Sequence, residues 1–340
     1  MHISVTHPID RALRRMGQIL FKPFDVGKWF TLGFCVFLAY LGEGGGANIQ
    51  LPGGGPGGPP GPGGGPTSAP IPWLQANLNW LLPLVLVGLI VIVGLTAVLI
   101  WLRSRGKFMF LDGIVRNRGA VVKPWKEFRE LGNSLFGFTF LLNAIGFGAM
   151  LLIAALAAAI AWPDILAGRF DDRAIAGVVI GGILALASGL TWIVVGLLLE
   201  SFVVPAMYHR NERVMDAWRT VRQEILAGHG GTIVLFYLMK IVLGIAIAII
   251  TFLATCLTCC LAALPYLGSV LLLPIYVFSR CYTLHFIQQF GPQWAIFQYD
   301  RGMRFCARCG YDLTGNVTGV CSECGMPIPP PMAEPPEASS

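Results

Sequence analysis

Charged residues are scarce in this chain of 340 residues. Only 12% of its residues are Asp, Glu, Lys or Arg, whereas about 25% are charged in soluble globular domains. Hydrophobic residues make up 55% of the chain, and its mean hydropathy is +0.68. This balance lies outside the range of soluble globular proteins and predicts an all-α integral membrane protein.

Sequence signatures of several enzyme classes are also missing. The chain has no G-x-x-x-x-G-K-[ST] motif for nucleotide phosphates, no H-E-x-x-H motif for a hydrolytic metal and no G-x-S-x-G elbow. The five histidines are scattered, and none stands with carboxylates at the spacing of metal ligands. We therefore predict a protein that is not an enzyme.

Long apolar runs are the main feature of the chain, because about 20 such residues cross a bilayer core. We expect a transmembrane domain over residues 1–290, with three helical hairpins. The first span is the shortest, and no A-x-A cleavage site follows it, so it is interpreted as a retained span. The six predicted spans are 26–42, 77–102, 133–162, 174–208, 231–261 and 265–288.

Lys and Arg are distributed unevenly between the two sides of these spans. Five precede or open the first span, eight lie between the second and third, four between the fourth and fifth, and three after the sixth. The opposite side holds only Arg169 and Arg173. Because positive charge concentrates on the cytoplasmic side, we predict a multi-pass inner (cell) membrane protein with both termini in the cytoplasm.

Two segments have compositions that cannot form a core. The loop 43–76 contains the run 52–66, in which every residue is Gly or Pro, and we interpret it as a flexible extracytoplasmic segment. The C-terminal tail 326–340 is Pro-rich and is predicted to be disordered.

A short amphipathic pattern precedes each predicted hairpin, with apolar residues at steps of four and then three beside a basic residue. Trp125 and Trp218 occupy the centre of the apolar face in two of the three copies, where an indole ring suits the headgroup boundary. We predict three interfacial helices that lie against the lipid bilayer. The apolar positions are Ile9, Leu13 and Met16, then Val121, Trp125 and Phe128, then Val214, Trp218 and Val221.

Three charged residues fall inside predicted spans, where a charge requires a partner. Glu200, Lys240 and Arg280 each lie about eight or nine residues from the predicted cytoplasmic end of their span, and a rise of about 1.5 Å per residue gives them similar depth. They are predicted to form one cluster, in which Glu200 bridges the two cations. A structural role, in which the charges hold the helices together, is favoured over a pathway for protons or substrate. The residual positive charge would suit an anionic lipid headgroup or an anionic solute as a ligand.

The fourth predicted span contains a G-x-x-x-G motif formed by Gly177 and Gly181. Small residues at this spacing allow two helices to approach closely. We interpret the motif as a helix-packing face.

Four cysteines near the C-terminus form a C-x-x-C…C-x-x-C array within residues 306–325. Two such knuckles supply four thiolates for a closed tetrahedral zinc site, with a redox dithiol or an iron site as alternatives. A glycine follows each knuckle, where the backbone turns under the sulfur, often with a positive φ. A linker over 291–305 would join this domain to the membrane domain. The predicted zinc ligands are Cys306, Cys309, Cys321 and Cys324.

Two resemblances add to these patterns. The tail CARCGYDLTGNVTGVCSECG resembles the zinc ribbons of the CxxCGYDL…CxECG type that are appended to many uncharacterised bacterial proteins. The stretch 200–290, with its FVVP and AW sequences, looks like the membrane domains found beside glycerophosphodiester phosphodiesterases. This second resemblance implies the membrane architecture alone, since the clustered His, Glu and Asp residues of that catalytic domain have no counterpart here.

Together these features predict a membrane scaffold or regulatory protein whose cytoplasmic zinc ribbon docks a protein partner. One alternative is a transporter or channel for an anionic solute or lipid that uses the intramembrane charge cluster. Another is a membrane tether for nucleic acid, but Arg308 is the only basic residue between the first and last cysteines of the ribbon. Because nucleic-acid binding needs a basic surface, protein docking is favoured. Oligomeric state is left open.

Overall fold

The computed structural model describes residues 3–22, 24–41, 71–166, 171–257, 264–297 and, near the C-terminus, 319–321, 323, 325 and 327. Within these residues the secondary structure is helical apart from one isolated β-bridge. The elements are α1 (His7–Phe21), α2 (Val26–Ala39), α3 (Ile71–Val115), α4 (Val122–Glu127), α5 (Arg129–Leu166), α6 (Asp172–Leu198), η1 (Leu199–Val203), α7 (Val204–Arg210), α8 (Val214–Val221), η2 (Arg222–Leu226), α9 (Gly230–Leu257), α10 (Pro265–Leu271), α11 (Leu273–Ile287), η4 (Gln288–Phe290) and η5 (Pro292–Trp294).

Four helical segments are long and apolar enough to cross a membrane. They coincide with the second to fifth predicted spans, so the part of the chain that the structure describes confirms the predicted helical architecture and is compatible with a membrane protein. Only the first of them extends well beyond its predicted bound: the helix continues past residue 102 to Val115 and includes charged residues such as Lys107. The four segments are Trp80–Val115, Arg129–Asp164, Asp172–Arg210 and Gly230–Leu257.

The first and sixth predicted spans form shorter helices. The helix α2 has 14 residues, which at about 1.5 Å per residue is about 21 Å, less than the bilayer core of about 30 Å. The sixth predicted span is divided at Leu272 into α10 and α11, and α11 starts with Pro274 in its first turn. A proline is tolerated there but not in a helix interior, so it favours the break. The count of six spans stays a prediction.

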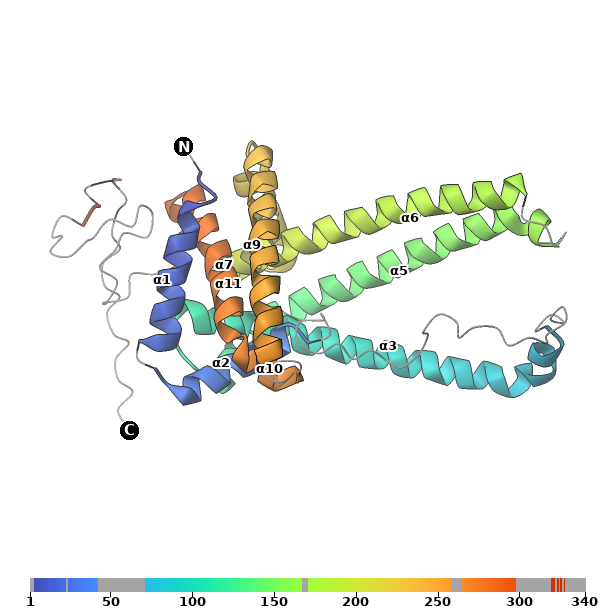
Figure 1. Ribbon diagram of the computed structural model, residues 1–340, viewed down its shortest axis with the longest axis horizontal. Helices are drawn as coiled ribbons and strands as arrows, with labels where there is room; N and C mark the ends of the chain where they lie inside the picture. The colour runs from blue at the N-terminus through green and yellow to red at the C-terminus, as the bar shows by residue number, and fades with distance from the viewer. Residues whose placement is uncertain are drawn as a thin grey trace.

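The helices pack into one body, and three of them project from it. Figure 1 shows α3, α5 and α6 extending to one side, while α1, α2, α7 and α11 lie together at the other. We call this packed part the helical body: α1, α2, α4, α7, α8 and α11, with the adjoining ends of α3, α5, α6 and α9. Its core contains large fully buried side chains from several of these elements, including Phe108, Phe202, Phe236, Tyr282 and Trp294.

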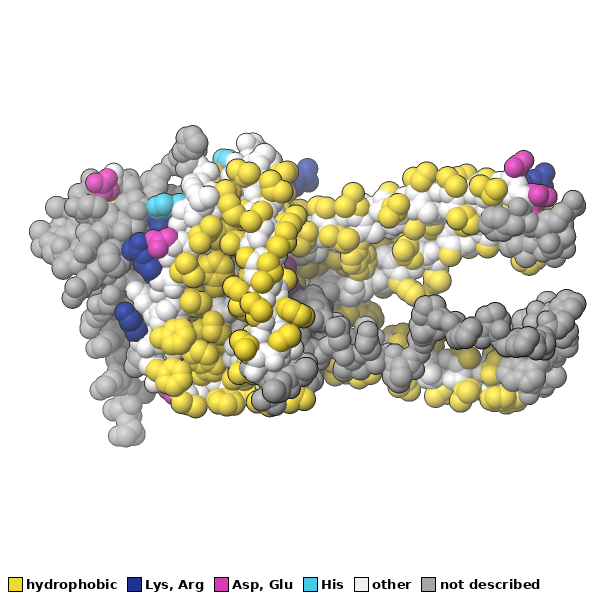
Figure 2. Space-filling view, in the orientation of Figure 1, with side chains coloured by type: hydrophobic (Ala, Val, Ile, Leu, Met, Phe, Trp, Pro, Cys, Tyr) yellow, Lys and Arg dark blue, Asp and Glu magenta, His cyan; other side chains and the backbone are white. Residues whose placement is uncertain are grey.

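The projecting helices carry exposed apolar side chains along their length, as Figure 2 shows. On α3 these side chains extend from Trp80 to Val98, and each of these two residues is 53% exposed. Such a surface suits lipid and not water. The boundary between exposed and buried residues on α3 falls near Ile100, where the helical body begins.

The helix α9 follows a different direction from the projecting helices in Figure 1. Its contact with the body centres on Phe236, whose ring stacks on Phe286 at 4.2 Å and on Tyr282 at 5.6 Å between ring centroids. Beyond this point α9 exposes apolar side chains such as Ile245 and Phe252. At this point α9 therefore packs against α11.

A helix is present at each predicted amphipathic segment: α1, α4 and α8. The helix α8 buries Val214, Ala217 and Val221 against the body and exposes Met215. The apolar stripe of α8 therefore covers protein and not only lipid. The chain after α11 also packs into the body, because Trp294 and Phe297 are buried. The linker predicted from residue 291 accordingly starts later, since these apolar side chains are part of the core.

The G-x-x-x-G motif lies where α5 and α6 pack along each other, which is the most extensive helix pairing in the described residues. A Cβ atom added at Gly177 would lie 2.7 Å from the Ala157 carbonyl oxygen, and one at Gly181 would lie 2.8 Å from Ala157 Cβ. A Cβ atom at the neighbouring Gly182 would meet nothing within 4 Å. The motif is therefore a packing face between these two helices.

This pair of adjacent glycines gives a matched test. Gly181→Val should overpack the α5–α6 contact and destabilise the protein by about 1–3 kcal/mol. Gly182→Val adds the same side chain to open space and should have a much smaller effect. Thermal unfolding of both variants in the same detergent compares them directly, and equal losses of stability would contradict the packing assignment.

Candidate functional site

Glu200 lies in η1, a π-helical segment between α6 and α7. In this segment the N–H of Val204 donates to the carbonyl oxygen of Leu199, five residues earlier. The next donor in this pattern would be Pro205, which has no N–H, so the pattern supplies none for the Glu200 carbonyl. Arg280 of α11 supplies it instead, with Nη1 donating to that oxygen at 3.0 Å.

The Glu200 carboxylate pairs with two cations from different helices. Lys107 of α3 donates to Oε2 and forms an ion pair with it. Arg280 Nη2 lies 3.6 Å from Oε1. Lys107 and Arg280 are only 8% and 5% exposed, so both cations depend on this carboxylate for charge neutralisation. One acid thus connects α3, η1 and α11.

Lys240, the third residue of the predicted cluster, lies beside this pair without contacting the carboxylate directly. Its Nζ donates to the Ser201 hydroxyl at 3.3 Å and lies 5.6 Å from the centroid of the Phe236 ring. The structure therefore brings Glu200 and Arg280 together and places Lys240 at the next residue of η1. Its expected place on Glu200 is taken by Lys107.

Sequence reasoning missed Lys107 because it assigned the residue to a loop after the second span. The helix α3 in fact continues to Val115. The signal was the run from Phe108 to Leu111 immediately after the lysine, which is apolar and fully buried. A loop on a basic membrane rim would not bury such a run.

The described part of this cluster contains more positive than negative charge. Lys107, Lys240 and Arg280 contribute three positive charges and Glu200 one negative charge. A site of this composition can fasten helices together, and it can also attract an anion. It contains no pair of carboxylates for acid and base chemistry.

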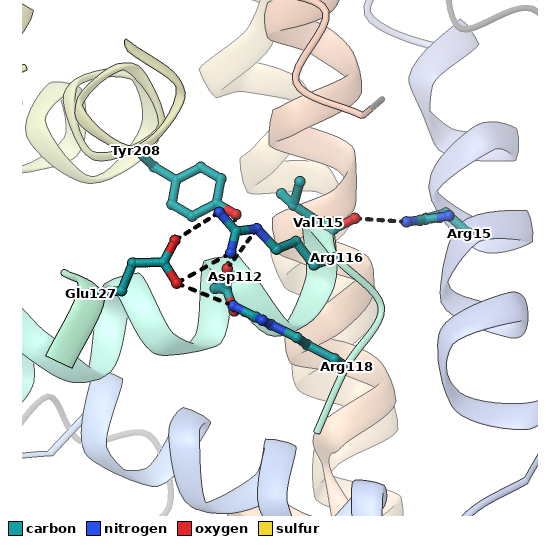
Figure 3. A network of polar contacts seen from close by, with 7 residues as sticks. All are labelled: Arg15, Asp112, Val115, Arg116, Arg118, Glu127 and Tyr208. Carbon is teal, nitrogen blue, oxygen red and sulfur yellow. Dashed lines mark hydrogen bonds and ion pairs between the residues drawn. The ribbon is translucent and has the colours of Figure 1, made fainter. Parts of the chain in front are cut away.

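A second polar network lies at the end of α3 and is shown in Figure 3. Asp112 is fully buried and accepts hydrogen bonds from Arg118 Nε at 2.8 Å and from the Tyr208 hydroxyl at 3.1 Å. Arg118 contacts Oδ2 of this carboxylate, whereas Tyr208 contacts Oδ1, and Arg116 Nε lies 3.3 Å from Oδ1 as well. Asp112 therefore ties α3 to α7 and to the turn that follows α3.

The same turn is fixed from two further elements. Arg116 Nη2 lies 2.9 Å from Glu127 Oε1 on α4, and Arg118 Nη2 lies 3.4 Å from Oε2. From α1, Arg15 Nη2 donates to the Val115 carbonyl at 3.1 Å, which satisfies an acceptor at the C-terminal end of α3. Four elements, α1, α3, α4 and α7, thus meet at this network (Figure 3).

The Glu127 carboxylate is electrostatically perturbed by these contacts. Burial disfavours its charged form, but the hydrogen bonds and positive charge of Arg116, together with the charge of Arg118, outweigh burial and lower the pKa of Glu127. Ionised Glu127 is therefore the form that the network stabilises.

The predicted interfacial anchors are half-buried. Trp125 of α4 packs edge-on against Trp101 of α3, with 5.7 Å between ring centroids, and Trp218 of α8 packs against Phe138 of α5 at 6.4 Å. Both tryptophans therefore join the short helices to the bases of the projecting helices. A role at the lipid headgroups is compatible with these positions and stays a prediction.

The predicted metal site falls mostly outside the described residues: only Cys321 of its four cysteines is described, and Cys306, Cys309 and Cys324 lie outside. Cys321 is buried, and its carbonyl accepts the Gly325 N–H at 2.9 Å. Gly325 has a φ of +66°, and Val320 and Pro327 form the isolated β-bridge around the turn. This is the local backbone predicted for the second knuckle. Zinc binding itself stays a prediction.

The helical architecture corresponds to a known protein family. The profile of a family described as family of unknown function (DUF7544) matches residues 3–296. The chain belongs to this family. No curated protein and no solved structure matches the chain. The likeness to membrane domains beside glycerophosphodiester phosphodiesterases therefore stays a prediction.

The region that matches DUF7544 contains the helices but not the predicted zinc ribbon. It runs from residue 3 to residue 296, so it includes every helix described above and both charge networks. It ends before the four cysteines. The helical architecture with Glu200 and Asp112 therefore lies within the DUF7544 region, and the predicted ribbon is attached to it.

Removing the Glu200 charge tests its role in the DUF7544 region. Glu200→Gln leaves Lys107 and Arg280 buried without an anion, and loss of one partner of a buried ion pair costs about 3–5 kcal/mol. We expect a loss of this size in detergent unfolding measurements. Glu130→Gln, at an exposed position on α5, should change stability by less than about 0.5 kcal/mol. Equal stability of Glu200→Gln and the wild type would contradict the assignment.

The second network predicts a pH dependence. Because the pKa of Glu127 is lowered in the folded state, its stabilisation is fully present above the unfolded pKa of about 4.3 and is lost as the pH falls through the folded pKa. The difference in melting temperature between the wild type and Glu127→Gln should therefore shrink between about pH 6 and about pH 3. A difference that stays constant over this range would count against the network.

Proposed function

We propose that the protein is a non-enzymatic integral membrane scaffold or regulatory protein whose zinc ribbon docks a cytoplasmic protein partner. The observation that supports this best is the turn at Cys321, where the positive φ of Gly325 and its hydrogen bond to the Cys321 carbonyl have the form of a zinc knuckle. A zinc ion held by four thiolates has no open coordination position. Such a site stabilises a small domain and performs no catalysis.

The helical body supports the scaffold part of the proposal. Its core, the Glu200 ion pairs and the Asp112 network join the helix ends into one unit. In the predicted topology, most Lys and Arg residues lie on the same side of the membrane as the predicted ribbon, and this distribution favours an inner membrane location with both termini in the cytoplasm. Cytoplasmic thiols are kept reduced, and reduced thiols favour metal over disulfide.

A second candidate function is a transporter or channel for an anionic solute or lipid. The observation that favours it is the excess of positive charge around Glu200, because Lys240 donates to a hydroxyl and not to a carboxylate. An anion could be attracted to Lys240 from the lipid or solvent side. The same arrangement also suits a structural fastening, so this function takes second place.

Metal analysis tests the primary proposal. Full-length protein purified under reducing conditions should contain about one zinc ion per chain. Cys309→Ser should lose most of it, whereas Cys256→Ser, on the exposed face of α9, should retain it. Wild-type protein without bound zinc would contradict the ribbon assignment.

Docking requires a second readout on the same variants. After cross-linking in cells, a cytoplasmic protein should be recovered with the wild type and with Cys256→Ser, but not with Cys309→Ser. Equal recovery with all three would contradict docking through the folded ribbon. Anion flux in proteoliposomes that Lys240→Gln abolishes, without loss of stability, would move the assignment to the transporter.

A further inference from the structure

Arg105 of α3 is a buried cation whose charge is not neutralised like that of Lys107. Its side chain is only 7% exposed, yet no carboxylate among the described residues forms an ion pair with it. The charged side chain that acts on it electrostatically is another cation, Arg129. Burying a cation without an anion is costly, so this position calls for a negatively charged partner.

The surroundings of Arg105 form a built site. The guanidinium carbon lies 4.4 Å from the Trp101 ring centroid and 4.8 Å from that of Trp125, between the two indoles. Its Nη2 donates to Asn133 Oδ1 at 3.1 Å, and Trp101 Nε1 donates to the same oxygen at 3.3 Å. Arg105 Nε is buried and has no acceptor among the described residues.

The sequence makes room for this arrangement at one position of α5. A Cβ atom at Gly132 would lie 2.8 Å from Arg105 Cγ, so only a glycine lets the arginine lie against α5. The next residue, Asn133, is exposed at the surface and holds the guanidinium from that side. The site is therefore rigid on its protein side and reaches the surface at Asn133.

Its level along α3 points to the lipid headgroups. Val98, Trp101 and Arg105 lie on one face of the helix, at steps of three and four residues. Val98 is 53% exposed at the end of the exposed apolar stretch. At about 1.5 Å per residue, Trp101 lies about 4.5 Å and Arg105 about 10 Å beyond it. In a bilayer leaflet, the acyl chains are followed by the glycerol region and then by the phosphate groups. Val98, Trp101 and Arg105 follow the same order along α3.

We propose that Arg105, with Trp101, Trp125 and Asn133, binds the phosphate group of an anionic phospholipid in the leaflet at the helical body. The guanidinium fork matches phosphate oxygens, and the indoles pack against the glycerol and upper acyl region. Exposed Lys126 and Arg129 flank the site and favour a headgroup with a net negative charge over a zwitterionic one. This inference is independent of the ribbon and of Glu200.

The test uses full-length protein and defined lipids. Native mass spectrometry would compare retention of phosphatidylglycerol and phosphatidylcholine by the wild type, Arg105→Gln and Arg105→Lys. Both lipids have a phosphate group, but only phosphatidylglycerol has a net negative charge. The positive charge of Arg105 at this contact therefore predicts about tenfold tighter binding of phosphatidylglycerol than of phosphatidylcholine by the wild type, reduced to about twofold or less in Arg105→Gln. Arg105→Lys keeps the charge without the fork and should fall between. The control Arg219→Gln removes an exposed cation of α8, outside the site, and should retain most of the preference.

Equal phosphatidylglycerol preference in the wild type and Arg105→Gln would overturn the proposal. Cross-linking of wild-type protein with a diazirine-labelled phosphatidylglycerol decides the case in which Arg105→Gln does not fold. Labelled peptides should contain Trp101 or Trp125, and labelling confined to other peptides would overturn the site. Displacement of the lipid by millimolar inorganic phosphate or glycerol phosphate would assign the site to a free anion and overturn the lipid assignment.

Discussion

The ion pairs of Glu200 are the interaction on which the rest of the helical body depends. A single carboxylate neutralises Lys107 from α3 and Arg280 from α11, and both cations are buried. Without it, two charges would remain in a site of low polarity, where the free-energy penalty is several kcal/mol for each ion. The backbone at this point is equally dependent on Arg280, which binds the carbonyl oxygen that the π-helical segment and Pro205 leave without a helical donor. Charge pairing and backbone geometry are therefore satisfied together.

The arrangement divides the molecule into two parts with different physical tasks. The projecting parts of α3, α5 and α6 present apolar side chains outward, and α5 and α6 pack closely through Gly177 and Gly181. The helical body contains the polar networks, which set how the helix ends meet. Asp112 fixes the turn after α3 to α7, and Glu127 adds α4. A rigid base of this kind suits the proposed role as a membrane scaffold.

Much of the membrane architecture followed from the sequence because length and hydropathy of apolar runs are strong signals. The four long helices, the short helices at α1, α4 and α8 and the packing face at Gly177 and Gly181 belong to this class. The extent of α3 did not follow, because Lys107 and Arg105 resembled the charged end of a span. Their burial depends on partners supplied by distant segments, Glu200 and Asn133, which hydropathy does not encode.

In the predicted site, too, features that depend on the local sequence could be predicted, whereas contacts between distant segments could not. The pairing of Glu200 with Arg280 could be anticipated from their equal depth in two spans. The pairing of Glu200 with Lys107 instead of Lys240 could not be anticipated, because it depends on how α3 packs against η1. The positive φ of Gly325 was predictable from the local C-x-x-C-G pattern, since a tight turn imposes that conformation wherever it occurs. Local constraints are legible in sequence, whereas contacts between helices require their relative positions.

The coupling between Glu200 and Lys107 tests the central claim most directly. A double-mutant cycle would measure the unfolding free energies of the wild type, Glu200→Gln, Lys107→Met and the double variant in one detergent. Because Lys107→Met removes one of the two cations that Glu200→Gln leaves without an anion, the double variant should be more stable than the sum of the single effects predicts, by about 1–3 kcal/mol. Single effects that add to within about 0.5 kcal/mol would show that the two residues act independently and would contradict the account.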